Sequence, residues 1–198
     1  MFAVVESGSI VSMPKGNKGI QIGDLKYPAS IFSLWTETER NAIGVYTVEI
    51  DNTNKKDDEW YVNTEITYSF GSGKVTGTYG TATAKAIEDT DAVDNEGNKL
   101  KDENGNQIIN EGLKTIKKRI IDNECAGLLA PSDWMVIKAT ETGTTMDSGW
   151  KTWRASVRTK CNSMQTQIDN ASDVDALAAL FTRNENGVRP LGDFPVKA

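Results

Sequence analysis

Histidine is absent from the 198 residues of this chain. Histidine is the commonest general base, the usual partner of a serine or cysteine nucleophile, and the commonest metal ligand in proteins. Its absence argues against most acid–base enzymes and against a metalloprotein. We therefore expect no enzymatic activity, no catalytic residues, no metal and no cofactor.

Cysteine is scarce. The two cysteines, Cys125 and Cys161, each lie in a segment that we expect to be helical, and they form no Cys-x-x-Cys pair. With no secretory signal in the sequence, neither a disulfide framework nor a redox motif is indicated. We expect two free thiols that are mostly buried.

Long apolar runs and basic stretches are also missing. No run approaches the roughly 20 apolar residues that cross a bilayer, and the N-terminal MFAVVESGSIV lacks the regions of a signal peptide. The formal net charge is -6, and the basic cluster at 114–119 lies among acidic neighbours. We expect no membrane, no nucleic-acid partner and synthesis in the cytosol.

What is present suits a folded protein: 38% of residues are hydrophobic, and five are tryptophan. The order of patterns predicts an α+β fold. Residues 1–87 read as a strand-rich module with a short helical segment, and residues 113–198 as a mostly α-helical module. Between them, residues 88–112 form a polar connector or hairpin rich in Asp, Asn and Gly.

The first module alternates β-like runs with turn signals. Residues 2–22 predict two or three strands, and further strands are expected over 45–50, 60–70 and 74–84. Ile31, Leu34 and Trp35 have helical spacing, Thr36 or Thr38 is the N-cap candidate of a further turn of helix, and Gly44 ends it. The glycines at 71, 73, 77 and 80 precede β-like sequence, so they indicate turns and not a phosphate loop.

The connector contains an internal repeat, or echo, in which Asp94–Leu100 is followed by the similar segment Asp102–Ile108. The echo fits either a hairpin with Glu-Gly and Asn-Gly turns or a flexible linker. From Asp102 it also matches the start of an EF-hand loop. That match fails because Gln107 stands where Gly is needed and Leu113 where Glu is needed, so a solvated loop is favoured over a calcium site.

The second module has helical periodicity. A stripe from Leu113 to Leu128 ends at Pro131, and Ser132-Asp133 can cap a second helix that Gly143 closes. Asp147 or Ser148 caps a longer helix that runs to Ile168. Ser172 with Asp175 resembles a capping box before a helix over 174–181, and the tail from 182 is expected to be extended.

Tryptophan and arginine are most concentrated in one part of this module, at Trp134, Trp150, Trp153, Arg154 and Arg158. Trp and Arg are enriched where proteins bind partners, but tryptophan at helical spacing also packs cores. The group is therefore a candidate partner interface, with core packing as the alternative.

Two segments resemble known proteins. Residues 128–158, LLAPSDWMVIKATETGTTMDSGWKTWRASVR, resemble a unit shared by bacteriophage tail-fibre and tail-fibre-assembly proteins. In that unit a Ser/Thr-Asp-Trp element is followed by a Glu-Gly turn and a Trp-x-x-aromatic-Arg helix. Residues 27–48, YPASIFSLWTETERNAIGVYTV, resemble a phage tail-protein module, and the insert at 88–112 departs from the pattern.

The resemblance implies a protein of the virion tail, made in the cytoplasm of the host bacterium and bound to other tail proteins. Its partners would be tail-fibre, baseplate or tail tube/adaptor subunits, and several copies would be present in each particle. One reading is a structural, attachment component of the tail. The alternative is an assembly chaperone that helps the tail fibre to form.

A third reading is a receptor- or glycan-binding module at the tail tip. It would use exposed aromatics of the strand-rich module, on which sugar faces stack. Trp60 and Tyr61 are the first candidates, and strand alternation places them on opposite faces. Tyr68 and Tyr79 are further candidates.

Overall fold

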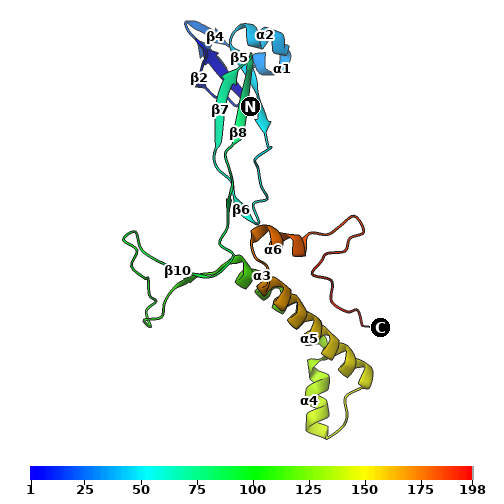
Figure 1. Cartoon of the computed structure of the whole chain (residues 1–198). Helices are drawn as coiled ribbons and strands as arrows, with labels where there is room; N and C mark the ends of the chain where they lie inside the picture. Colours follow the sequence, from blue (N-terminus) through cyan, green and yellow to red (C-terminus); the bar gives the residue numbers. More distant parts are fainter. Residues whose placement is uncertain (198) are drawn as a thin grey trace. The chain divides into compact units, whose positions relative to one another are not determined.

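The computed structural model describes residues 1–197, and the chain divides into two compact units. Unit 1 is Met1–Thr83 and holds most of the strands, whereas unit 2 begins at Ala84 and holds the longer helices (Figure 1). The predicted α+β class is confirmed. The division falls after Thr83, so residues 88–112 belong to the helical unit.

Unit 1 is built on a five-stranded sheet in the order β2-β1-β5-β8-β7. Neighbouring strands are antiparallel except for β5 and β8, which are parallel. The predicted hairpin around residues 71–73 is the β7–β8 pair. The strands are β1 (Phe2–Glu6), β2 (Ser9–Ser12), β5 (Val45–Asp51), β7 (Ile66–Gly71) and β8 (Lys74–Tyr79).

Strand β1 is buried on both faces, because alternate side chains enter two different apolar clusters. Val4 packs with Val45 and with Phe32 of helix α1 (Ile31–Leu34) on one face. Ala3 and Val5 pack with residues of the other strands, including Val75, on the opposite face. The edge strands β2 and β7 lie side by side, so the sheet rolls around this second cluster.

The helical segment of unit 1 is short and well capped. Helix α2 (Glu37–Ala42) begins at Thr36, whose hydroxyl accepts a hydrogen bond from the Glu39 backbone N–H, while the Glu39 carboxylate accepts one from the Thr36 N–H. Thr36 is therefore the cap, not Thr38. The remaining strands of the unit and its boundary are β3 (Ile20–Ile22) paired with β4 (Leu25–Tyr27), and β6 (Tyr61–Val62) paired with β9 (Thr83–Ala84).

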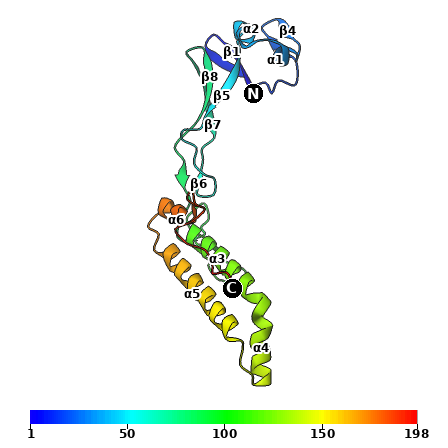
Figure 2. The same ribbon diagram turned by 90° about the vertical axis from the view of Figure 1, so that its right-hand side faces the viewer.

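Unit 2 is organised around two antiparallel helices, α3 (Leu113–Leu129) and α5 (Ser148–Asp169) (Figure 2). Each contributes a buried stripe at helical spacing, to which α6 (Val174–Phe181) adds Val174 and Leu177. After α3 the chain makes the 3-10 turn η1 (Ala130–Ser132) and enters α4 (Asp133–Thr142). The stripes consist of Leu113, Lys117, Ile121 and Cys125 on α3, and Arg154, Val157, Cys161, Met164 and Ile168 on α5.

The helix ends of unit 2 agree with the sequence at Asp147 and Gly143 and differ from it at Ser172. Asp147 caps α5 by accepting a hydrogen bond from the Trp150 N–H, and Gly143 ends α4 with a left-handed φ of 64°. The predicted capping box at Ser172 is wrong. Asp173 is the N-cap of α6 and accepts from the Ala176 N–H, because its carboxylate reaches that donor while the Ser172 hydroxyl turns to Asp173.

Residues 88–112 form an arm with a regular hydrogen-bond pattern. Its base pairs β10 (Thr90–Asp91) with β11 (Ile109–Asn110). Ala92, Leu100 and Ile108, eight residues apart, then form a closed ring in which each N–H donates to the carbonyl of another. Two short hairpins leave this ring, so the echo in the sequence corresponds to two copies of one turn.

Both hairpin turns have the pattern Asx-x-x-Gly. The Asp94 carboxylate accepts hydrogen bonds from the backbone N–H groups of Glu96 and Asn98, and Asp102 repeats this with Asn104 and Asn106. Hydrogen bonds lower the pKa of both carboxyl groups, chiefly from the Asn98 backbone N–H to Asp94 and from the Asn106 side-chain amide to Asp102. The glycine of each turn, Gly97 and Gly105, has a positive φ.

The tail after α6 has no regular structure but is held against the helical pair. Asn184 repeats the Asx-x-x-Gly turn, with Oδ1 accepting from the N–H groups of Asn186 and Val188. Leu191 is buried and its carbonyl accepts from Lys160 of α5 at 2.8 Å. Leu191 is therefore the residue by which the tail joins the core of unit 2.

Candidate functional site

A buried arginine fixes the junction between α3 and α4. Arg154 is only 4% exposed, and its guanidinium donates to the Leu129 carbonyl at 2.7 Å and to the hydroxyl of fully buried Ser132. It also pairs with Asp133, the first residue of α4, at 2.5 Å. The planar guanidinium therefore ties one face of α5 to three successive parts of the turn.

This contact changes the role predicted for Arg154. As part of a candidate partner interface it was expected at a surface, but its donors are used inside the chain. The Ser132-Asp133 cap is likewise wrong in detail, since Ser132 makes no capping bond to α4 and instead donates to the Leu129 carbonyl. Arg154 positions the helix that follows and is not itself available to a partner.

Helix α4 has apolar side chains but no buried residue. Trp134 is 56% exposed and Ile137 is 58% exposed, and Val136 is also exposed. Trp134 and Ile137 lie three positions apart, which puts them on the same side of the helix. The Lys138 ammonium lies 5.9 Å from the centroid of the Trp134 ring, yet Trp134 and Ile137 both stay more than half exposed, so the helix presents an apolar side to solvent.

Two hollows flank the contact between α4 and the loop before α5. The first, of about 330 Å³, is lined by Trp134, Lys138 and Trp150 among others. The second, of about 450 Å³, has apolar walls from Val136, Ala139 and Met146, and its cationic residues are Lys151, Arg154 and Arg158. Ala139 and Met146 line both hollows, so they separate one from the other.

The tryptophans of the candidate interface divide into two kinds. Trp153 is half-buried, and its indole Nε1–H donates to the Pro195 carbonyl of the tail at 2.9 Å. Trp150 packs edge-on against Trp153 with ring centroids 5.6 Å apart, and the Lys197 ammonium lies over its ring. These two rings chiefly anchor the tail, whereas Trp134 faces solvent.

Of the five predicted interface residues, Trp134 and Arg158 are exposed. Sequence reasoning missed Ile137, Val136 and Lys151, which share the same end of the unit. The available signal was the consecutive apolar run at 134–137. Such a run wraps around a helix and does not form one stripe, so one face cannot bury all of it.

The aromatic rings proposed for sugar binding do not expose an open face on which a sugar could stack. The prediction that Trp60 is exposed is wrong, since it is 6% exposed and belongs to the core of unit 1. Tyr61 is half-buried, and the Lys56 ammonium lies 5.6 Å from its ring centroid. Tyr79 is covered in the same way by Lys55, and Tyr68 is also half-buried.

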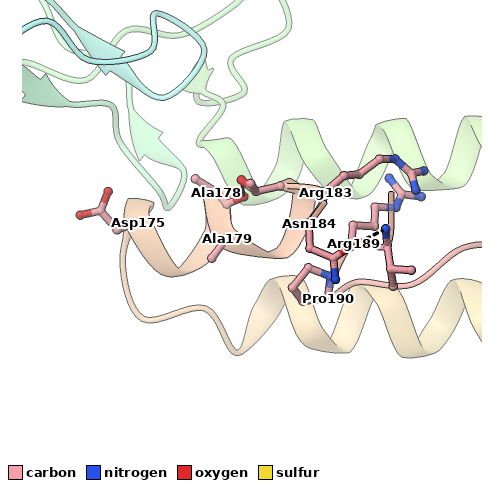
Figure 3. A pocket seen from close by; sticks show the side chains of 9 residues that line it. Asp175, Ala178, Ala179, Arg183, Asn184, Arg189 and Pro190 are labelled. Carbon is pink, nitrogen blue, oxygen red and sulfur yellow. Dashed lines mark hydrogen bonds between the residues drawn. The ribbon is translucent and has the colours of Figure 1, made fainter. Parts of the chain in front are cut away.

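A third hollow of unit 2, about 560 Å³, lies along α6 and the following segment (Figure 3). Figure 3 shows Asp175 at the opposite end of the group from Arg183 and Arg189. Asp193 pairs with Arg183 at 2.7 Å and with Arg189 at 3.3 Å, and the arginines lower the pKa of its carboxyl. These cations are engaged in holding the tail, so the hollow does not present a free charged group to a substrate.

Cys125 and Cys161 are free and buried, as the sequence predicts. Burial, followed by the neighbouring Cys125 thiol and the Asp122 carboxylate, raises the pKa of Cys161 to about 12. A thiol with so high a pKa is a poor nucleophile. In residues 1–197 no three His, Cys, Asp or Glu side chains gather as a metal site.

Within the described residues, none of the helices has the length and apolar character needed to cross a membrane. Comparisons of the chain with protein-family models, with curated proteins and with solved structures gave no match.

Proposed function

We propose that the chain is a bacteriophage tail-associated protein that acts by binding another tail protein, with α4 as its main contact surface. The observation that carries the proposal is the exposed apolar side of α4, where Trp134 and Ile137 are each more than half exposed. Exposed tryptophan at the centre of an apolar patch is the usual anchor of a protein interface.

The contacts that hold the start of α4 in place favour a binding role for its exposed apolar side. Arg154 holds the start of the helix through Ser132 and Asp133, so the apolar side is presented in one orientation before any partner arrives. A preorganised surface loses less conformational entropy on binding. The resemblance of residues 128–158 to tail-fibre and tail-fibre-assembly proteins supplies the class of partner, namely a tail-fibre, baseplate or adaptor subunit.

The proposed role is structural, with the chain retained in the virion tail in several copies. The alternative from the sequence, an assembly chaperone, uses the same surface and differs only in whether the chain leaves. Neither role requires catalysis or a cofactor.

The test uses the phage that encodes the chain. Purified particles and the infected lysate are compared by quantitative mass spectrometry for the wild-type chain and for a Trp134→Ala/Ile137→Ser variant. We expect the wild-type chain in particles at a fixed ratio to the tail subunits, and the variant to be depleted about tenfold or more, as loss of an anchor residue requires.

The matched control is Leu34→Ser, which removes an exposed apolar side chain of unit 1 and should leave incorporation unchanged. Incorporation of the α4 variant at the wild-type level would contradict the proposal. A wild-type chain abundant in lysate but missing from particles would identify the chaperone role instead.

A further inference from the structure

The hollow between Val136 and Arg158 combines apolar walls with unpaired positive charge. Lys151 and Arg158 are exposed, and neither forms an ion pair within residues 1–197. They are seven residues apart on α5, which separates them by about 10 Å along one side of the helix. Arg154 lies between them but is neutralised by Asp133.

The hollow is lined by three cationic residues and by no acidic one, in a chain whose formal net charge is -6. A partner for the hollow must carry negative charge together with apolar side chains, because only that combination matches both the rim and the walls.

The arm of unit 2 has that combination. Residues 91–108 contain five carboxylates and two lysines, a formal net charge of -3. Glu96 and Glu103 lie in the two hairpin turns and are exposed. The aliphatic residues around the ring are exposed as well: Val93, Leu100, Ile108 and Ile109.

The arm is stiff enough to act as a ligand. Asp94 and Asp102 each tie their own turn with two backbone hydrogen bonds, and the ring of Ala92, Leu100 and Ile108 holds the two hairpins together. A preorganised arm would lose less entropy on docking than a disordered linker of the same length.

The arm cannot fill the hollow of its own chain. It joins the N-terminal end of α3, where the Asp89 carboxylate accepts from the Gly112 N–H and the Ile87 carbonyl from the Lys114 N–H. The hollow lies past the other end of α3, whose 17 residues span about 25 Å. Figure 1 shows the arm, marked by β10, and α4 at opposite ends of the α3–α5 pair.

We propose that the hollow lined by Val136, Lys151 and Arg158 receives the acidic arm of a second copy of this chain. The contact is head to tail, so each copy retains a free arm at one end and a free hollow at the other. Such contacts close into a ring or continue as a chain of subunits. This inference does not rest on the proposed tail function.

The experiment measures the mass of the full-length chain by sedimentation velocity over a range of concentrations, at low salt and at about 1 M salt, where charges are screened beyond about 3 Å. We expect self-association at low salt that weakens at high salt. A hollow variant, Lys151→Glu/Arg158→Glu, and an arm variant, Glu96→Lys/Glu103→Lys, should each weaken self-association about tenfold or more.

Mixing the two variants gives the decisive measurement. The hollow variant has an acidic arm and an acidic hollow, and the arm variant has a basic arm and a basic hollow, so each fits only the other. Association should therefore return in the mixture. The matched control, Lys18→Glu/Lys26→Glu, makes the same change of net charge as the hollow variant, just before β3 and within β4, and should associate like the wild type.

A wild-type chain that sediments as a monomer at every concentration overturns the proposal, as does a mixture that stays monomeric. All six substituted residues are exposed, and unchanged circular dichroism will show that each variant is folded. Particle incorporation, which tests the tail function, is measured separately.

Discussion

Helices α3 and α4 are separated by one turn of 3-10 helix, yet they use their apolar residues in opposite ways. On α3 a buried residue recurs at every fourth position from Leu113 to Cys125, and all but Lys117 are apolar. This stripe packs against α5. On α4 they are consecutive, and none is buried. Apolar content therefore does not decide burial; the spacing of the residues and the presence of a facing element do.

The same substitution on both helices should have very different effects on stability. Ile121 of α3 is fully buried, whereas Ile137 of α4 is more than half exposed. Ile121→Ala should lower the free energy of unfolding by about 3–4 kcal/mol, since a buried cavity is created. Ile137→Ala should change it by less than about 0.5 kcal/mol. Urea denaturation measures both, and equal losses would mean that α4 is covered in solution.

Substitution of Arg154, at the junction between α3 and α4, should have the next largest effect on the free energy of unfolding. Arg154→Met keeps the apolar stem and removes the donors to Ser132, Leu129 and Asp133, so we expect a loss of about 2–3 kcal/mol. Most of this loss comes from the two buried acceptors, the Leu129 carbonyl and the Ser132 hydroxyl. Asp133 is half exposed, so its ion pair with Arg154 contributes little. Arg158→Met, one turn further along, is the control and should stay within about 0.5 kcal/mol in guanidinium denaturation.

The start of α5 offers a smaller test of how local sequence specifies a helix end. Asp147→Ala removes the acceptor for the Trp150 N–H and should cost about 1 kcal/mol. Ser148→Ala, at the first helical position, should have almost no effect on thermal unfolding. A larger loss for Ser148 than for Asp147 would show that the cap was assigned to the wrong residue.

The smallest effect concerns the pH dependence of the α3–α5 contact. The pKa of Cys161 is raised from 9.0 to about 12, so the folded state holds this proton more tightly than the unfolded state. Its contribution to stability is complete below pH 9 and is lost as the pH rises toward 12. Stability should therefore fall less steeply over this range in Cys161→Ala than in the wild type. Identical slopes in urea titrations would mean that the thiol is solvated.

Much of the fold could be predicted because the signals were local. The stripes of α3 and α5, the glycine that ends α4 and the β7–β8 hairpin all follow from spacing within a few residues. The rolled sheet of unit 1 could not be predicted, since β2 and β7 are far apart in sequence and no local pattern pairs them.

The candidate site was predicted in part. Trp134 and Arg158 are exposed as a partner surface requires, but Arg154 is buried because its acceptors come from a turn more than 20 residues earlier. The prediction that Trp60 is exposed was wrong because local sequence does not reveal distant contacts. Alternation shows which residues share a face of a strand, but it does not show which face is covered.

The ring of Ala92, Leu100 and Ile108 has a consequence for how this chain can change over generations. Because the ring brings together the two ends of the arm, everything beyond it can be lengthened, shortened or exchanged while α3 still starts from the same point. Insertions whose ends stay close are tolerated by a fold. The arm is thus a place where the length of the chain can change without repacking the helices behind it.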